Sequence, residues 1–262
     1  MNVIPKTTKE INRMIEGGKM LALIVKDLLS FVQVGVRCDL IDKKAKELCE
    51  KYKVKPAFLN YEMDGKKYPS YVCVCINEEV VHGIPSQNKV IENGDIVTVD
   101  MGIIYKGLYL DMARTIGVGK ISSVSRNVIK ASENALISAI KKCRPGNLLS
   151  DVSRAIYNTA RKYKCKPMIE LVGHGIGKAL HEDPSIPGYW IESVYEDLVL
   201  KKGMTFAVES IITSGKDITV EISKEDGWTT WPKDKALTAV FEDTIVVSDP
   251  PVVLTAFKNF LK

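Results

Sequence analysis

The feature that most restricts the fold of this chain is an internal repeat. Lys-Tyr-Lys-Val-Lys-Pro at residues 51–56 returns as Lys-Tyr-Lys-Cys-Lys-Pro at 162–167, an offset of 111 residues. Further along, Gly-Asp-Ile-Val-Thr-Val-Asp at 94–100 corresponds to Gly-Met-Thr-Phe-Ala-Val-Glu at 203–209, an offset of 109 residues. The matches keep their order and nearly their offset. We therefore expect two related halves, at about 7–118 and 119–250, within a single domain spanning residues 1–262.

Each half is expected to hold two helices followed by antiparallel strands, an α/β fold of the α+β type. Thr7 and Glu10 have the spacing of a capping box, and apolar residues follow at helical intervals. Asp39 is expected to cap a second helix that ends near residue 52. In the second half, we predict helices at 123–142 and 150–163. No linker rich in proline, glycine or serine separates the halves.

A β-hairpin is predicted directly before the boundary between the halves. Two apolar strands, Ile96–Ile104 and Leu108–Ile116, flank a turn at Lys106–Gly107, where glycine supplies the backbone angle that a tight turn needs. The strands contain Asp100 and Asp111. Because side chains alternate between the two faces of a strand, a two-residue turn puts both carboxylates on one face, as opposite or diagonal neighbours roughly 5–8 Å apart.

Two carboxylates at that separation repel one another unless a positive charge lies between them. The hairpin alone leaves three alternatives: the basic side chain of Arg114, a metal ion, or two acids that simply face solvent. The repeat favours the metal, because Glu209 corresponds to Asp100 and Glu242 corresponds loosely to Asp111. Related halves would bring all four carboxylates to one centre, where their burial without cations would be very costly.

Composition argues against several other classes of protein. With 37 basic and 32 acidic residues the net charge is +5, and no dense block of Lys and Arg predicts a specific nucleic-acid partner. Transient association with an anionic assembly such as the ribosome stays compatible with this charge. We find no signal peptide and no apolar stretch long enough to span a membrane. The six cysteines contain no C-x-x-C pair, which indicates a reduced, cytoplasmic chain.

The three histidines, His82, His174 and His181, all lie in segments punctuated by glycine or proline. Their spacing is not that of an H-E-x-x-H helix. One imidazole with four carboxylates suits two divalent ions, such as Mn, Fe, Co or Zn, that share bridging carboxylates. Such ions, about 3.5–4 Å apart, generate a hydroxide near neutral pH. The other two histidines would then face substrate. Metal affinity should rise from pH 5 to 7 as His174 and the carboxylates lose protons.

Taken together, the motifs resemble those of methionine aminopeptidase in its short type I form, without an N-terminal zinc-binding extension. The similarity runs from about residue 6 to 250. It rests on Asn77-Glu-Glu-Val-Val-His82-Gly-Ile-Pro85, Val99-Asp100, Asp111-Met-Ala-Arg-Thr115, Gly173-His174-Gly-Ile-Gly177, His181-Glu182, Val208-Glu209 and Phe241-Glu242.

The resemblance implies a pita-bread fold in a single catalytic domain that removes the initiator methionine from nascent chains when the second residue is small. It implies five ligands for two divalent metals: Asp100, Asp111, His174, Glu209 and Glu242. Asp111 and Glu242 would bridge the ions, and Glu209 would also take a proton from the bridging water. His181 would polarise the scissile carbonyl and His82 would contact the substrate backbone. Residues similar to those that line the family's methionine pocket are Tyr68, Cys73 and Trp228.

Three positions depart from the family's usual pattern: Ser210 replaces Pro, Val240 replaces Gln, and Asp243 replaces His. Additional residues at 63–67 are expected to reshape the rim of the pocket. Two alternatives stay open at this point. A proline-specific dipeptidase or aminopeptidase would share the ligands but generally carries a large N-terminal domain. A non-catalytic peptide-binding relative would be expected to have lost ligands, and this chain keeps them.

Overall fold

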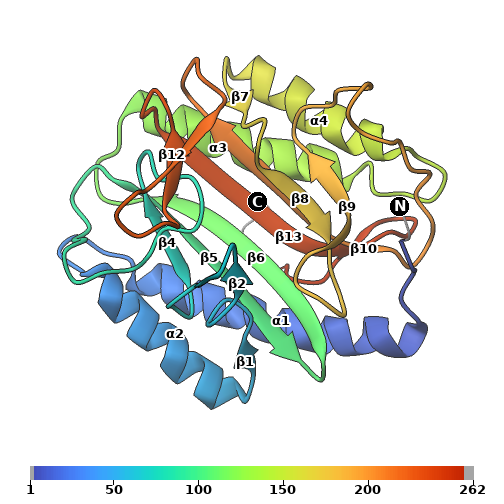
Figure 1. The fold of residues 1–262 in the computed structure, drawn as a ribbon, viewed down its shortest axis with the longest axis horizontal. Helices are drawn as coiled ribbons and strands as arrows, with labels where there is room; N and C mark the ends of the chain where they lie inside the picture. Colours follow the sequence, from blue (N-terminus) through green and yellow to red (C-terminus); the bar gives the residue numbers. More distant parts are fainter. Residues whose placement is uncertain (1–2, 257–262) are drawn as a thin grey trace.

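The structure is a computed structural model that describes residues 3–256 (Figure 1). It contains long helices and one large sheet. The helices are α1 (Thr8–Phe31), α2 (Cys38–Tyr52), α3 (Ser123–Ile140) and α4 (Leu149–Lys162). The strands are β1 (Lys55–Pro56), β2 (Glu62–Met63), β3 (Lys66–Lys67), β4 (Cys73–Ile76), β5 (Ile96–Tyr105), β6 (Leu108–Gly117), β7 (Lys166–Pro167), β8 (Val172–Gly175), β9 (Glu182–Pro187), β10 (Thr205–Thr213), β11 (Val220–Ile222), β12 (Thr230–Pro232), β13 (Thr238–Val246) and β14 (Val252–Val253).

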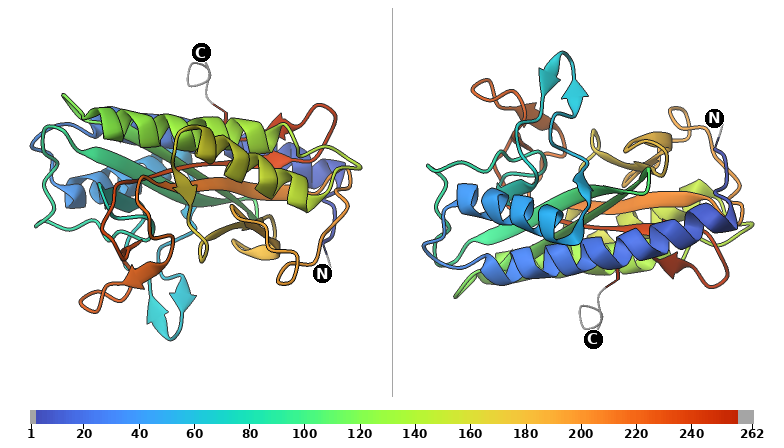
Figure 2. Two further views of the ribbon diagram at one scale, coloured as in Figure 1. Left: turned by 90° about the horizontal axis from the view of Figure 1, so that it is seen from above. Right: turned by 90° about the horizontal axis from the view of Figure 1, so that it is seen from below.

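Ten of these strands form one antiparallel sheet, in which the main path runs β1-β5-β6-β13-β10-β8-β9. Strands β4, β7 and β14 attach to β5, β10 and β13. Helix α1 packs on β5 and β6, and α3 packs on β10 and β13, so the helices cover one face of the sheet (Figure 2). The hairpins β2–β3 and β11–β12 rise on the other side (Figure 2). The expected α+β architecture of the pita-bread fold is confirmed.

The two halves follow the same order of elements. Helices α1 and α2 lead to β1, which pairs with β5, while α3 and α4 lead to β7, which pairs with β10. The repeated Lys-Tyr-Lys-x-Lys-Pro segment forms the end of the second helix in each half. Its central lysines, Lys53 and Lys164, both adopt left-handed backbone angles, with φ of 54° and 57°. The repeat therefore encodes a helix stop followed by an edge strand. That residues 1–262 form a single catalytic domain stays a prediction.

Local signals in the first half are largely followed by the structure. Thr7 caps α1 and forms the capping box with Glu10. Asp39, however, does not cap α2: the helix starts at Cys38, and Asp39 lies in its first turn, where its carboxylate accepts hydrogen bonds of 2.9 and 2.8 Å from Arg37. In the first turn, its negative charge still interacts favourably with the positive end of the helix dipole.

The predicted hairpin is present, with each strand one residue longer than expected. Tyr105 pairs with Leu108, which leaves Lys106 and Gly107 as a two-residue turn. Both turn residues have positive φ, 48° and 79°, as a turn that matches the twist of the flanking strands requires. The register of β5 and β6 follows from this turn.

All six cysteines are free and buried, consistent with the reduced chain that was expected. Between residues 3 and 256, no helix combines the length and the apolar character needed to cross a bilayer.

Candidate active site and metal centre

Four carboxylates lie on one face of the sheet because of its register. Asp100 on β5 is opposite Ala113 on β6, Ala113 is opposite Glu242 on β13, and Glu242 is opposite Glu209 on β10. Residues that pair across antiparallel strands point to the same face, so these side chains form one row. Asp111 precedes Ala113 by two residues on β6, so its side chain lies on the same face of the sheet. Both halves thus contribute two acids, and the small side chain of Ala113 leaves space between them.

Within residues 3–256, no basic side chain of the sheet neutralises this row of acids. Arg114 follows Ala113 and therefore points to the helix-covered face. There its Nη2 donates a hydrogen bond of 2.7 Å to Asp243, with both side chains less than 10% exposed. The alternative that Arg114 separates Asp100 from Asp111 is therefore wrong.

The electrostatics of the row favour protonation of the metal-free site. Burial raises the pKa of Asp100 to about 7. Burial, together with the neighbouring carboxylates, also raises the pKa of Asp111, Glu209 and Glu242. The ionised acids of this row would repel one another, and a bound cation would offset this repulsion.

His174 on β8 faces the row from its side. Its Nδ1 lies 2.9 Å from the carbonyl oxygen of Gly175, which can only accept, so the proton is on Nδ1. The lone pair of Nε2 is then free, and this atom lies 4.0 Å from Oε1 of Glu242. Burial and His181 lower the pKa of His174 to about 3, so the imidazole is neutral. A carbonyl that fixes the tautomer in this way is the usual support of a metal-bound histidine.

The residues present fit a divalent metal. Ligand atoms of Asp111, His174 and Glu242 all lie within 4.8 Å of one another. One oxygen of Asp100 is buried and has no hydrogen-bond partner among residues 3–256. Buried polar atoms without a partner are rare and call for an explanation such as an ion. Oxygen ligands with one imidazole suit Mn, Fe, Co or Zn.

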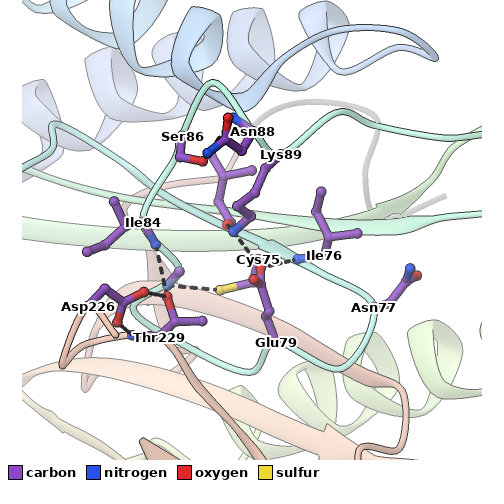
Figure 3. A network of polar contacts seen from close by, with 12 residues as sticks. Cys75, Ile76, Asn77, Glu79, Ile84, Ser86, Asn88, Lys89, Asp226 and Thr229 are labelled. Atoms are coloured by element: carbon purple, nitrogen blue, oxygen red, sulfur yellow. Dashed lines mark hydrogen bonds and ion pairs between the residues drawn. The ribbon is translucent and has the colours of Figure 1, made fainter. Parts of the chain in front are cut away.

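The loop that carries His82 is fixed by contacts from two strands. The Gly83 N–H donates to Cys75 Sγ at 3.3 Å, and the next N–H along the chain donates to Thr229 Oγ1 at 3.4 Å (Figure 3). A Cβ at Gly83 would lie 2.5 Å from the Val74 carbonyl oxygen, so only glycine fits here. His82 itself has a φ of 57°, an angle that few residues other than glycine adopt unless their neighbours hold them.

A cavity of about 270 Å³ opens over the row of acids. Its walls include the five predicted metal ligands, Asp100, Asp111, His174, Glu209 and Glu242. They also include every residue predicted to meet substrate, namely Tyr68, Cys73, His82, His181 and Trp228. The structure thus brings together all side chains that the sequence singled out.

One side of the cavity is an aromatic recess. The rings of Tyr68 and Trp228 meet edge to face with centroids 5.2 Å apart, and both residues are at most 5% exposed. Tyr68 is oriented by a hydrogen bond of 3.0 Å from its hydroxyl to the Gly83 carbonyl. Cys73, at 3% exposure, completes this wall with a neutral thiol, because burial raises its pKa. Such a recess suits an unbranched apolar side chain.

Sequence reasoning missed several residues of the cavity. Phe58, Leu180 and Ile211 line it but could not be told from ordinary core residues in the sequence. Tyr61 also lines it, and its hydroxyl lies 2.6 Å from Nδ1 of His181. A signal for Tyr61 was present, since it lies two residues before the additional residues at 63–67. The structure forms these residues into the hairpin β2–β3, and Met63 reaches the cavity, as the expected change to the rim requires.

The three departures from the family pattern leave the row of acids intact. The backbone of Ser210 accepts a hydrogen bond of 2.6 Å from Ser132 on α3. Val240 is buried in an apolar cluster. Asp243 stands where the family usually has histidine. It forms the ion pair with Arg114 and also accepts a hydrogen bond of 2.6 Å from Thr255.

Comparison with known proteins identifies the family. Residues 12–249 match the model of metallopeptidase family M24. The chain is 36% identical over 250 residues to a methionine aminopeptidase of Aquifex aeolicus, covering 94% of this chain and 96% of that protein. It is 32% identical over 247 residues to methionine aminopeptidase 1 of Bacillus subtilis, covering 94% of this chain and 96% of that protein.

Solved structures agree with these matches. The methionine aminopeptidase of Thermotoga maritima superposes with a TM-score of 0.91 at 36% identity, covering 98% of this chain and 100% of that chain. The prolidase of Pyrococcus furiosus shares the fold, with a TM-score of 0.76 at 23% identity, but this chain covers only 66% of it. The chain therefore belongs to metallopeptidase family M24 and, within that family, to the methionine aminopeptidases.

Proposed function

We propose that this enzyme removes the initiator methionine from nascent chains whose second residue is small, with two divalent metal ions in the row of acids. The observation that carries the proposal is the meeting of four carboxylates, His174 and the aromatic recess in one cavity. Membership of a metallopeptidase family implies a divalent metal. The number of ions is part of the proposal, supported by a set of acids too large and too crowded for one ion to neutralise.

In this proposal, five side chains hold the metals. Asp111 and Glu242 lie centrally, on neighbouring strands, and would contact both ions. Asp100 would serve one ion, and His174 and Glu209 the other. Bound ions of this kind supply a nucleophile from water near neutral pH and withdraw charge from a carbonyl oxygen.

The remaining roles fall to residues of the walls. Glu209, on the edge of the row, would take the proton from the attacking water. From there it could return the proton to the leaving amine. His181 would donate a hydrogen bond to the scissile carbonyl oxygen, and His82 would contact the substrate backbone. The methionine side chain would occupy the recess of Tyr68, Cys73 and Trp228.

A peptide panel tests this function. The purified enzyme, stripped with a chelator and reconstituted with Mn, Co, Fe or Zn singly, should release methionine from Met-Gly and Met-Ala peptides and hardly at all from Met-Lys peptides. Release of the first residue from X-Pro dipeptides instead would assign the chain to the proline-specific activity. Cytoplasmic location, transient ribosome association and the absence of a specific nucleic-acid partner stay predictions.

A further inference from the structure

The additional residues between Tyr61 and Tyr68 form a small hairpin with a closed base. Strands β2 and β3 pair through Glu62–Lys67 and Met63–Lys66, and the turn residues between them, at 64 and 65, have φ of 51° and 74°. The Tyr68 N–H donates to the Tyr61 carbonyl at 2.8 Å. Figure 2 shows this cyan hairpin standing out from the body of the molecule. Its base fixes the backbones of two tyrosines that both line the cavity.

The side chains of these two tyrosines, Tyr61 and Tyr68, contact different residues of the cavity. Tyr68 is buried in the aromatic recess beside Trp228. Tyr61 instead reaches the opposite wall, where its ring meets that of His181 edge to face, with centroids 5.2 Å apart. Its hydroxyl and Nδ1 of His181 are 2.6 Å apart. Across residues 3–256, this is the one hydrogen bond that the ring of His181 makes.

The direction of that hydrogen bond decides what His181 can do. A phenol hydroxyl that donates to Nδ1 requires that nitrogen to be unprotonated. A neutral imidazole then carries its single proton on Nε2, the nitrogen left for the cavity. An N–H at this position can donate to a carbonyl oxygen, whereas a bare nitrogen there would repel it.

We propose that Tyr61 is a positioning residue that fixes His181 as its Nε2–H tautomer and aims that proton at the scissile carbonyl oxygen. The role of His181 as the carbonyl's donor rests on the proposed function; the tautomer does not. The hairpin β2–β3 holds Tyr61 in place through its closed base, so the additional residues support catalysis as well as shaping the rim. The competing interpretation is that Tyr61 merely forms a wall of the methionine recess.

Nitrogen-15 NMR of the histidine side chains tests the tautomer directly. With three histidines in the chain, the His82→Gln and His181→Gln variants suffice to assign every ring. In the zinc-loaded enzyme at neutral pH, we expect His181 to show a protonated Nε2 and an unprotonated Nδ1. The Tyr61→Phe variant should show both tautomers of His181. The control Tyr105→Phe, which removes the contacts of a surface hydroxyl with Glu16 and Lys106, should leave all rings unchanged.

The NMR result also defines how the proposal fails. A protonated Nδ1 on His181 in the unmodified enzyme, or a tautomer that Tyr61→Phe leaves unchanged, would overturn it. This readout does not involve peptide cleavage, so it holds even if the enzyme proves to cleave other peptides.

Kinetics separate positioning from recess formation. With a Met-Ala peptide, Tyr61→Phe should lower kcat about tenfold or more and leave KM nearly unchanged, because misdirected groups cost rate rather than binding. A recess wall would instead raise KM and alter the preference for methionine over leucine. In the His181→Ala background, Tyr61→Phe should cost nothing further. An equal second loss in that background would contradict the proposal, while no cleavage of any Met peptide by the unmodified enzyme would contradict the proposed function.

Discussion

The two halves of the molecule use the same strand positions for different purposes. In the first half, Cys75 on β4 pairs with the residue of β5 that lies two positions before Asp100. In the second half, His174 on β8 pairs with the residue of β10 that lies two positions before Glu209, so Cys75 and His174 occupy equivalent positions. Cys75 is covered by the Gly83 N–H, and burial raises its pKa, so its thiol stays neutral and is a poor ligand. At this equivalent strand position, therefore, the second half offers an imidazole that suits a metal, and the first half offers a neutral thiol that does not.

The connections between the central strands differ in the same way. In the first half, β5 and β6 are joined by a two-residue turn. In the second half, residues 214–237 separate β10 from β13 and carry the hairpin β11–β12 and Trp228. Asp226, in the turn between β11 and β12, accepts hydrogen bonds of 2.8 and 2.9 Å from the N–H groups of Trp228 and Thr229. The first half therefore joins its two acids by a tight turn, while the longer connection of the second half adds Trp228 to the recess that Tyr68 and Cys73 of the first half also line.

The largest expected effect comes from the central acid of each half. Asp111→Ala and Glu242→Ala should each lower kcat/KM by about a thousandfold or more, because each removes a shared ligand from the centre. Calorimetric titration with Mn should also show fewer ions bound per chain. An unchanged stoichiometry in either variant would show that the halves do not share the ions.

A second comparison concerns the residue after each central acid. Asp243 follows Glu242 and is paired with Arg114, whereas the buried Met112 follows Asp111. Asp243→Ala should lower the free energy of unfolding by about 3 kcal/mol, since it removes the carboxylate that forms a buried ion pair with the guanidinium of Arg114. Met112→Leu should cost less than about 1.5 kcal/mol. Urea denaturation measures both, and equal losses would refute this difference.

The flanking strands provide a test with a smaller effect. His174→Ala should weaken Mn binding at least about tenfold, because it removes a ligand outright. Cys75→Ala should leave Mn affinity unchanged and lower only the melting temperature, through the lost packing. Weakened binding in Cys75→Ala to the extent seen in His174→Ala would contradict the asymmetry between the halves.

The smallest expected effect is a dependence of metal affinity on pH. Asp100, with a pKa of about 7, holds a proton below neutrality that a metal must displace, so affinity should rise by about tenfold between pH 6 and 8. The expectation that His174 contributes to this rise is wrong, because its pKa of about 3 leaves it neutral throughout that range. Calorimetry in buffers of different ionisation enthalpy counts the protons, and the release should persist in His174→Ala.

How far the sequence predicts the structure depends on the range of the interactions. The capping box at Thr7 and the turn at Lys106–Gly107 follow from neighbouring residues, and the structure confirms them. The convergence of Asp100 with Glu209 followed from the repeat, which carries long-range information in a single sequence. Alternation along the second hairpin strand already places Arg114 on the face opposite to Asp111. The sequence could not reveal that Arg114 pairs there with Asp243, because nothing local to either residue specifies that contact.

The contacts of the cavity walls were the least predictable. Tyr61 meets His181 across 120 residues of chain, and both lie in segments whose course depends on neighbouring loops. The same holds for Ile211, which alternation along β10 places toward the cavity but which no pattern distinguishes from a core residue. The resemblance to a known family predicted the site residues, and only the structure shows the contacts that orient them.

Anomalous diffraction from crystals grown with excess manganese tests the central claim most directly. The account predicts two peaks about 3.5–4 Å apart, each contacted by both Asp111 and Glu242, with Asp100 on one side and His174 and Glu209 on the other. A single peak, or peaks that only one half of the molecule contacts, would contradict it.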